Sequence, residues 1–259
     1  MPMMPPQDLP LEINRLYPEV ARVALAAVYR DLAWQPRGDD HPFLALNMVG
    51  TVDGRAAVDG SSMGLGSLVD RQLMRVLRAN ADALLFGAGT LRAERVGRGV
   101  PAEFVPLRRA RGLAPQPLLA LLTASGDVPL ERAFFAEPER AVVFVAERTP
   151  RDRLARLRER AAVRVVGVDR PDPTAALRLL AREFGVRRVL CEGGPTLNRD
   201  LLGAGVLDEL FVTLAPKVVA GDGPPLVAGA ALVPPARLDL RSLYEHDGEL
   251  YLRYSIRIP

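Results

Sequence analysis

One carboxylate and two glycines lie together in the run CEGGPTLNRDLL (191–202). Glu192 precedes Gly193 and Gly194, which allow a backbone to approach a ligand, and Pro195 suits the first position of a helix. The free N–H groups at the start of such a helix favour an anion. The run therefore predicts an anion site, but an ordinary turn between a strand and a helix would carry the same residues.

Two further segments end in residues that could contact a ligand. LLFGAGT (84–90) places glycines and Thr90 after an apolar run, but Arg92 stands where a dinucleotide-binding G-x-G-x-x-G pattern has its last glycine. LNMVGTVDG (46–54) ends in Asp53-Gly54, which is also a common hairpin turn. Taken singly, each of these segments favours a turn over a ligand site.

Apolar runs that alternate with amphipathic segments must position these residues. We expect buried strands at 43–50, 81–87, 117–123, 141–146, 163–168, 187–194 and 208–215. We expect helices at 67–82, 150–160, 173–184 and 195–203, the first opening on a capping box of Ser67 and Asp70. This alternation predicts an α/β domain with helices on both faces of a sheet.

The two ends of the chain differ from its middle. Asp247-Gly248 joins 236–245 to 249–258 and predicts a terminal antiparallel hairpin, which would make the sheet a mixed one. We interpret residues 1–41 as an N-terminal extension, with an apolar helical pattern from Val20 to Val28, and residues 42–259 as one domain. We expect no chemistry in the extension.

Composition excludes several classes of function. Of the 259 residues 49% are hydrophobic and 25% charged, as in globular proteins. The 34 basic residues are interspersed with 31 acidic ones, and only 5% of residues are aromatic, so we expect no nucleic-acid partner. No basic leader precedes an apolar core and no run approaches the roughly 20 apolar residues of a membrane span. We expect a cytoplasmic protein with no membrane partner.

Cysteine and histidine are too few for common metal sites. Cys191 is the single cysteine, which excludes an intramolecular disulfide. With only His41 and His246 beside it, the chain lacks the ligands of a usual zinc site. We predict no metal site, and composition leaves only carboxylate-bound magnesium open.

Taken together, the segments that could contact a ligand follow one another, with several shorter motifs, in the order found in a known family. Asn47 and Thr51-Val52-Asp53-Gly54 are followed by Ser62, then by the motifs Leu77-Arg78-Ala79, Asp82-Ala83, Gly87 to Thr90, 192–196, 206–210 and Ala215-Pro216-Lys217. In this order the chain, over roughly residues 42–256, resembles the reductase domain of riboflavin biosynthesis. That domain belongs to the dihydrofolate-reductase-like superfamily. The resemblance implies a mixed, mostly parallel sheet with helices on both faces.

The resemblance also implies a reaction. Family members use NADPH to convert the ribosyl group of 5-amino-6-(5-phosphoribosylamino)uracil to ribityl, by hydride transfer to C1′ of the opened sugar. Such a transfer requires two ligands held face to face, so the protein contributes mainly positioning and electrostatics. The implied ligands are NADPH and a phosphorylated pyrimidine, and the implied assembly is a homodimer.

The resemblance assigns site residues by motif. Asn47, Asp53 and Glu192 are the implied catalytic residues, with Glu192 accepting from pyrimidine donors. Ser62, Arg78, Arg98 and Glu192 are the implied substrate contacts, and a cation near a helix C-terminus is the alternative interpretation of Arg78. The implied cofactor contacts are Val49, Thr51, Asp53, Gly64, Gly87, Thr90, Glu94, Gly193, Gly194, Thr196, Leu197 and Asn198.

Departures from the family pattern leave alternative functions open. Gly64 stands where the family often has a bulky residue, and Ala93-Glu94-Arg95-Val96 replaces an Ala-Asp-Asp-Pro run, with Arg98 as a substitute contact. The altered loop would also suit a pteridine reductase acting on dihydrofolate. From another class, the chain could be a nucleotide-binding module without catalysis. Forty residues are too few for the family's deaminase domain, and its zinc signature is missing, so we expect deamination on another protein.

Overall fold

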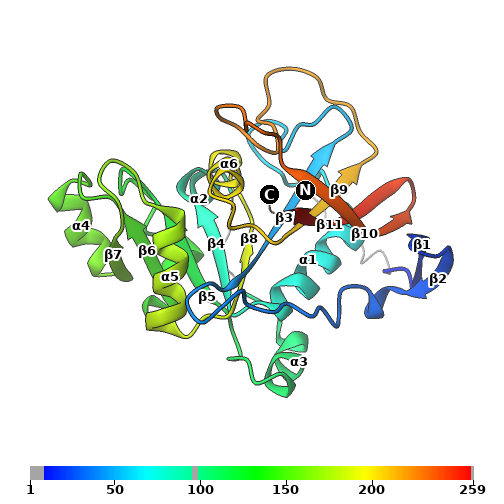
Figure 1. Cartoon of the computed structure of the whole chain (residues 1–259), viewed down its shortest axis with the longest axis horizontal. Coiled ribbons are helices and arrows are strands. Elements are labelled where there is room, and N and C mark those ends of the chain that lie inside the picture. The colour runs from blue at the N-terminus through cyan, green and yellow to red at the C-terminus, as the bar shows by residue number, and fades with distance from the viewer. Residues whose placement is uncertain (1–8, 95–98, 258–259) are drawn as a thin grey trace.

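The computed structural model describes residues 9–94 and 99–257, in which a long sheet is flanked by helices (Figure 1). The strands are β1 (Glu12–Tyr17), β2 (Ala21–Ala24), β3 (Phe43–Thr51), β4 (Ala83–Gly87), β5 (Leu118–Leu122), β6 (Ala141–Val145), β7 (Ala162–Val165), β8 (Arg188–Cys191), β9 (Glu209–Ala215), β10 (Arg237–His246) and β11 (Glu249–Arg257). The α-helices are α1 (Leu68–Asn80), α2 (Ala88–Ala93), α3 (Val105–Ala110), α4 (Arg151–Arg158), α5 (Pro173–Phe184) and α6 (Pro195–Gly203). Short 3-10 turns lie at 25–27, 102–104, 133–135 and 138–140.

The strands of the described ranges form a single sheet in the order β2-β1-β10-β11-β9-β3-β8-β4-β5-β6-β7. Neighbours from β9 to β7 run parallel, whereas β11, β10, β1 and β2 add antiparallel pairs. The expected mixed, mostly parallel sheet is confirmed. The terminal hairpin is confirmed as well, with His246 paired to Glu249 across its turn.

Helices cover both faces of the parallel part of the sheet. Leu73 and Leu77 of α1 enter one apolar cluster, while Leu180 of α5 and Leu201 of α6 enter the cluster on the opposite face. Parallel strands covered in this way are buried on both sides, which explains why their sequences are continuous apolar runs. All five residues of β6 are buried, for example.

The described part of residues 1–41 forms strands instead of the helix expected from Val20 to Val28. β2 pairs with β1, β1 pairs with β10, and only Leu25–Ala27 form a helical turn, of the 3-10 type. The helical prediction is wrong because the edge of β10 supplies backbone hydrogen bonds to an extended chain. A short apolar pattern carries no information about such a distant partner.

The same segment packs onto the amino end of β9. Trp34 is buried, and its indole N–H donates to the Glu209 carboxylate at 3.1 Å. Arg37 donates to Asp208 at 2.6 Å and to two nearby carbonyls. These contacts lie at the end of β9 opposite its carboxyl end. The boundary at residue 42 stays a prediction from the sequence.

The first turn of α1 is capped differently from the expected capping box. The Ser67 hydroxyl accepts from the amides of Val69 and Asp70, as expected. The Ser67 amide, however, donates to Glu249 at 3.1 Å and not to Asp70. The reciprocal half of the prediction is wrong, because the start of β11 brings a carboxylate to the cap that local sequence cannot show.

The described ranges contain neither a membrane-spanning helix nor a cluster of possible metal ligands. No helix there is both long and apolar enough to cross a membrane. The described His, Cys, Asp and Glu side chains form no group of three or more that could hold a metal ion. Burial raises the pKa of the Cys191 thiol to about 12, so this group stays protonated and is a poor nucleophile.

Candidate active site

The carboxyl ends of β9, β3, β8 and β4 meet at one edge of the sheet, because these four strands are adjacent and parallel (Figure 1). β3 ends there at Thr51, β4 at Gly87 and β8 at Cys191. Ligands of open α/β sheets bind at such an edge. The three segments that the sequence singles out therefore form one candidate site.

The two glycine turns are in direct contact. The Gly87 N–H donates to the Gly193 carbonyl at 2.8 Å, and Gly193 has a φ of +86°, which favours glycine. A Cβ on Gly194 would lie 2.9 Å from Thr90 Oγ1. Thr90 and the glycine pair thus pack so closely that a side chain at Gly194 would displace one of them.

Two uncapped helix starts lie beside each other at this contact. Gly87 is the N-cap of α2 and Gly194 that of α6, and neither supplies a side-chain cap. Pro195 occupies the first turn of α6, as expected. Because first-turn N–H groups lack partners within their helix, these two starts fit the phosphates of a dinucleotide.

The remaining cofactor-side residues of α6 differ in accessibility. Thr196 is exposed, whereas Leu197 and Asn198 are buried. Asn198 Nδ2 donates to the Leu226 carbonyl at 2.8 Å, and its Oδ1 has no hydrogen-bond partner in the described structure. Asn198 therefore fixes the loop around residue 226 against α6. Its predicted contact with a cofactor stays a prediction.

Arg78 and Glu192, both expected at the substrate, bind each other. Arg78 Nε and Nη2 donate to the two Glu192 carboxylate oxygens, each at 2.6 Å. The side chains are only 12% and 8% exposed, and Arg78 Nη1 also donates to the Gly99 carbonyl. Burial lowers the pKa of Arg78, but the charge of Glu192 and its hydrogen bonds together outweigh burial and raise the pKa. The two hydrogen bonds from Arg78 therefore hold the carboxylate in one orientation.

Asp53 organises the turn after β3. Its carboxylate accepts from the Thr51 hydroxyl at 2.6 Å and from the amides of Val219 and Ala220. The Thr51 hydrogen bond, followed by that of Ala220, lowers the pKa of Asp53 to about 2. Asp53 is thus an anion at neutral pH and cannot donate a proton. Thr51 is fully buried beneath it, and Val49 is half-buried on the same strand.

Ser62 lies on a tight turn that Glu94 holds. The Glu94 carboxylate accepts from the Ser62 amide at 2.5 Å and from the Ser61 hydroxyl. Glu94 is the C-cap of α2, the helix that starts at Gly87. It therefore joins the segment expected to contact the cofactor to the segment expected to contact the substrate. Arg98, the other expected contact of this loop, lies outside the described residues.

Gly64 follows on the same turn with a φ of +89°, and a Cβ there would meet no atom within 4 Å. The bulky residue often found at this place in the family would be strained by this backbone conformation. The departure noted in the sequence therefore has a local backbone reason. The cofactor contact expected at Gly64 stays a prediction.

Asn47 faces a small hollow between β3, β9 and α1. The hollow measures about 10 Å³, room for about one water molecule, and Asp70, Met74 and Thr213 are among the residues lining it. Burial raises the pKa of Asp70 to about 6, partly opposed by a hydrogen bond with Thr213. The sequence shows Asp70 only as a capping residue, because its approach to Thr213 depends on how α1 crosses β9.

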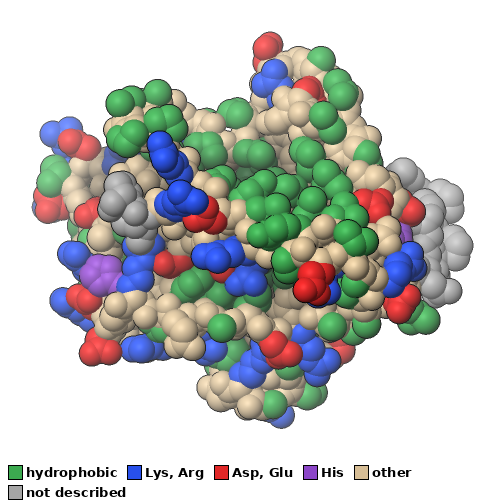
Figure 2. Space-filling view, turned by 45° about the vertical axis from the view of Figure 1, so that its right-hand side comes forward, with side chains coloured by type: hydrophobic (Ala, Val, Ile, Leu, Met, Phe, Trp, Pro, Cys, Tyr) green, Lys and Arg blue, Asp and Glu red, His purple; other side chains and the backbone are tan. Residues whose placement is uncertain are grey.

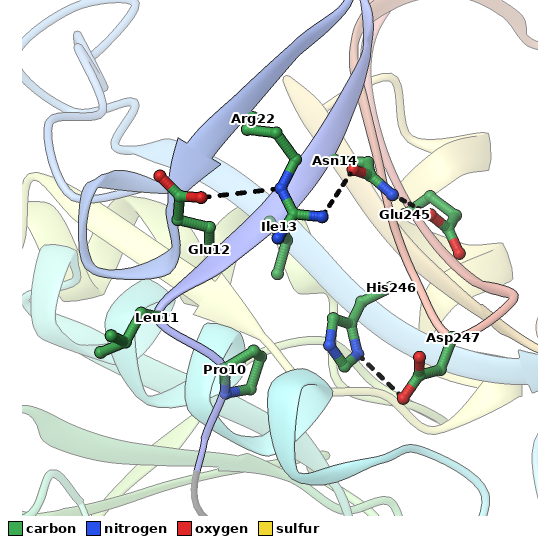
Figure 3. A pocket seen from close by; sticks show the side chains of 9 residues that line it. All are labelled: Pro10, Leu11, Glu12, Ile13, Asn14, Arg22, Glu245, His246 and Asp247. Atoms are coloured by element: carbon green, nitrogen blue, oxygen red, sulfur yellow. Dashed lines mark hydrogen bonds and ion pairs between the residues drawn. The ribbon is translucent and has the colours of Figure 1, made fainter.

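A wider hollow of about 590 Å³ lies elsewhere, between β1, β2 and the β10–β11 turn (Figure 3). Its polar side chains pair with one another: Arg22 with Glu12 at 3.6 Å, and His246 with Asp247 at 3.5 Å. Asn14 donates to Glu245 at 2.6 Å. Because these polar groups satisfy each other, we place the candidate site at the glycine turns and not here.

The fold matches a known class. A solved pyrimidine reductase-like protein from Corynebacterium diphtheriae superposes with a TM-score of 0.77, covering 91% of this chain and 99% of that one at 25% identity. A riboflavin biosynthesis reductase of baker's yeast shares the fold at 16% identity, with a TM-score of 0.67. The chain is thus a dihydrofolate-reductase-like α/β protein.

A comparison of the sequence with known families shows which family the chain belongs to. The model of the RibD C-terminal domain matches residues 42–252. The chain belongs to this family.

Curated relatives carry the names of pyrimidine reductases. The chain is 29% identical over 220 residues to the 2,5-diamino-6-ribosylamino-4(3H)-pyrimidinone 5′-phosphate reductase of Methanothermobacter thermautotrophicus, covering 83% of this chain and 99% of that protein. It is 32% identical over 182 residues to the riboflavin biosynthesis protein RibD of Mycobacterium tuberculosis, covering 70% of this chain and 44% of that protein. The chain thus spans less than half of the RibD protein but almost all of the separate reductase.

Proposed function

We propose that this chain is an NADPH-dependent reductase of a phosphorylated ribosylaminopyrimidine in riboflavin biosynthesis. One observation carries the proposal. The paired glycine turns at Gly87 and Gly193 lie beside the end of β8, where Glu192 pairs with Arg78 of α1. This arrangement supports binding of a nucleotide beside a polar ring at one sheet edge. The names of the relatives support the same activity.

NADPH is the proposed cofactor, and the residues present fit a dinucleotide. The close packing at Gly194 and the uncapped starts of α2 and α6 leave backbone N–H groups for phosphates. Gly87, Thr90, Gly193, Gly194 and Thr196 would hold that part, while Val49, Thr51 and Asp53 would lie nearer the nicotinamide. When bound, NADPH supplies the hydride that reduces C1′ of the opened sugar.

The chain's own residues bind and orient the substrate. Arg78 fixes the Glu192 carboxylate, which accepts hydrogen bonds from N–H groups of the pyrimidine. Asp53 remains ionised and holds the loop of Val219 and Ala220 close to the end of β3. Asn47 provides an amide beside the reacting sugar. These roles are positional and electrostatic, as hydride transfer requires.

Two pyrimidines are candidates for the substrate. The relatives that this chain matches over most of their length are named for 2,5-diamino-6-ribosylamino-4(3H)-pyrimidinone 5′-phosphate. Its ring carries adjacent N–H donors, which suit the two oxygens of Glu192. We therefore propose this compound first, and second the deaminated 5-amino-6-(5-phosphoribosylamino)uracil, which the resemblance implies.

A turnover assay tests the proposal. The purified chain is mixed with NADPH and, in separate reactions, with each pyrimidine or with dihydrofolate, and NADPH oxidation is followed by absorbance. We expect oxidation with a pyrimidine and none with dihydrofolate. Oxidation with dihydrofolate alone would instead define a pteridine reductase, and no oxidation with any compound would define a nucleotide-binding module.

We also propose that the chain forms a homodimer through the outer face of β9 and β11. Leu214, Val212 and Leu210 of β9 pair with Leu250, Leu252 and Tyr254 of β11, and all six are half-buried. Figure 2 shows hydrophobic side chains gathered in the middle of the face turned toward the viewer. Sedimentation at micromolar concentration checks the assembly, and a monomer would contradict it.

A further inference from the structure

Arg78 keeps two N–H donors for a ligand. Its guanidinium has five N–H donors, and Nε, Nη1 and Nη2 each donate one of them to Glu192 or to the Gly99 carbonyl. The direction of the two remaining donors is set by these contacts and by the main chain of Arg78. The residues that fix the Gly99 carbonyl and this main chain therefore decide how Arg78 and Glu192 face a substrate.

Arg108 of α3 holds the end of α1, where Arg78 lies. Its Nη1 donates to the carbonyls of Arg78 and Ala81 at 3.0 Å and 2.7 Å, and its Nε donates to the Ala114 carbonyl at 2.8 Å. The last carbonyls of a helix lack the usual partner four residues further along, and they carry partial negative charge. Arg108 thus binds the turn that carries Arg78 by its main chain.

Arg108 does this as a buried cation. The residue is 0% exposed, and burial lowers the pKa of its guanidinium to about 10, so the group is still charged at neutral pH. The carboxylate of Asp82 is near enough to act on this charge but pairs with Arg188 instead. Carbonyls at the end of α1 therefore compensate for a charge that is costly to bury. Because a guanidinium is a rigid, planar fork, it also fixes the carbonyls that it binds.

Gln116 fixes the other anchor of Arg78. Its Oε1 accepts from the Val100 amide at 2.8 Å, and its Nε2 donates to the Val100 carbonyl at 2.9 Å. The Val100 N–H and the Gly99 carbonyl belong to one planar peptide group, so Gln116 fixes the carbonyl that accepts from Arg78 Nη1. Gly99 is buried with a φ of +65°, and a Cβ there would collide with Gln116 Oε1.

Both side chains belong to one segment, residues 99–116. This segment follows the loop in which the sequence departs from the family pattern, and it contains the 3-10 turn at 102–104 and α3. Phe104, at the end of the turn, is buried and anchors the segment in the apolar cluster that α1 also enters. The segment therefore supports Arg78 at two points, its main chain and its guanidinium.

We propose that Arg108 and Gln116 are positioning residues for the reduction. Arg108 fixes the main chain of Arg78, and Gln116 fixes the Gly99 carbonyl that holds its guanidinium, so that Arg78 and Glu192 face the substrate together. Both residues act through Arg78 and not on the reacting atoms. This inference rests on the proposed function for the identity of the reaction.

Steady-state kinetics test the proposal. We expect Arg108→Met to lower kcat about 10- to 100-fold, as for a substrate misplaced by about 1 Å, and to leave NADPH affinity unchanged. Arg108→Lys keeps a cation beside the carbonyls and should recover part of the loss. Arg109→Met is the matched control, because Arg109 is the next residue of α3 and is exposed. It should have the kcat of wild type.

Gln116→Met tests the second anchor without removing a buried charge. We expect kcat to fall about 3- to 10-fold, as for one or two lost hydrogen bonds between neutral groups, again with NADPH affinity unchanged. Gln72→Met, a half-buried glutamine of α1, is the matched control and should behave as wild type.

Hydrogen exchange at the Arg78 Nε–H, followed by nuclear magnetic resonance, tests the same support without substrate. This N–H donates to Glu192. We expect Arg108→Met and Gln116→Met each to accelerate its exchange at least about tenfold more than that of the Val143 amide, which lies in the buried strand β6. Equal acceleration at both groups would indicate only a general loss of stability, and the proposal would be overturned.

The two measurements together separate this inference from the proposed function. Selective acceleration at Arg78, in variants of a chain that reduces no pyrimidine, would support the anchoring of Arg78 and contradict the proposed function. Turnover of a pyrimidine by the wild-type chain, with kcat unchanged in both variants, would do the reverse.

Discussion

The carboxylate of Glu192 lies against the guanidinium of Arg78, with two N–O distances of 2.6 Å. This pair joins the end of β8 to the last turn of α1, across 114 positions of the chain. Because both groups are buried, each one compensates for the charge of the other. The pair therefore stabilises the fold, and in the proposed function it also orients Glu192 toward the substrate.

Removal of Arg78 should affect both roles. We expect Arg78→Ala to lower the free energy of unfolding by about 3–5 kcal/mol, since it leaves Glu192 as an unpaired buried charge. In a chain that still folds, turnover should fall for phosphorylated and dephosphorylated pyrimidine alike, while NADPH affinity is retained. Denaturant unfolding and kinetics check this.

The double variant Arg78→Leu with Glu192→Gln provides the control, because it removes both charges. It should recover most of the stability but remain inactive. An Arg78→Ala chain as stable as wild type, or one impaired only with the phosphorylated pyrimidine, would return Arg78 to the phosphate contact expected from the sequence.

The packing at Gly194 predicts a loss of cofactor binding. In Gly194→Ala the new methyl group would lie 2.9 Å from Thr90 Oγ1, so either the Thr90 side chain or the glycine turn must shift. We expect NADPH affinity to fall at least about tenfold and stability to fall by about 1–3 kcal/mol, as in other overpacked sites. Fluorescence titration with NADPH measures the first effect.

Gly38→Ala is the matched control, since a Cβ at Gly38 meets no atom within 4 Å. It should bind NADPH as wild type does. Equal affinities for the Gly194 and Gly38 variants would show that the cofactor does not use the glycine turns.

Asp53 should hold its loop at every pH near neutrality. Its pKa of about 2 is below the ordinary 3.8, so its contribution is complete above about pH 4 and is lost as pH falls toward 2. We expect Asp53→Ala to accelerate hydrogen exchange at the Val219 and Ala220 amides at pH 7. Glu147→Ala, an exposed carboxylate elsewhere, is the control. Unchanged exchange in Asp53→Ala would exclude this role.

The pKa of Asp70 is shifted in the opposite direction from that of Asp53. Burial raises its pKa to about 6 from 3.8, so the folded chain binds more protons than the unfolded one between these values. Its effect on stability is therefore favourable at low pH and is lost as pH rises through about 6. We expect Asp70→Asn to raise the free energy of unfolding at pH 8 by about 1–3 kcal/mol, at about 1.4 kcal/mol per pH unit between the two pKa values. At pH 4 the variant should match wild type, and an equal gain at both pH values would contradict the assignment.

Local sequence predicts most of the fold. Apolar runs predict the parallel strands, because a strand covered on both faces has buried side chains on both sides. Asp247-Gly248 predicts the hairpin, because its turn needs positive φ values, which are 49° and 77° here. The extended chain at 12–24 is not predictable in this way, since its pairing with β10 depends on residues more than 200 positions away.

The candidate site is predictable in its residue types but not in its contacts. Glycine pairs and strand ends indicate a ligand edge, and the structure brings the predicted turns at Gly87 and Gly193 together. The pairing of Arg78 with Glu192 requires the crossing of α1 and β8. The hydrogen bonds from Arg108 to the end of α1 likewise require α3 to pack beside that helix. Neither arrangement leaves a mark in a single sequence.

Isotope transfer tests the central claim most directly. The chain is incubated with NADPH that carries deuterium on the reactive carbon of its nicotinamide ring, together with the diaminopyrimidinone phosphate. We expect the deuterium on C1′ of a ribityl product when the transferring face is labelled. A ribityl product without label from either labelled face, or no ribityl product from either pyrimidine, would contradict it.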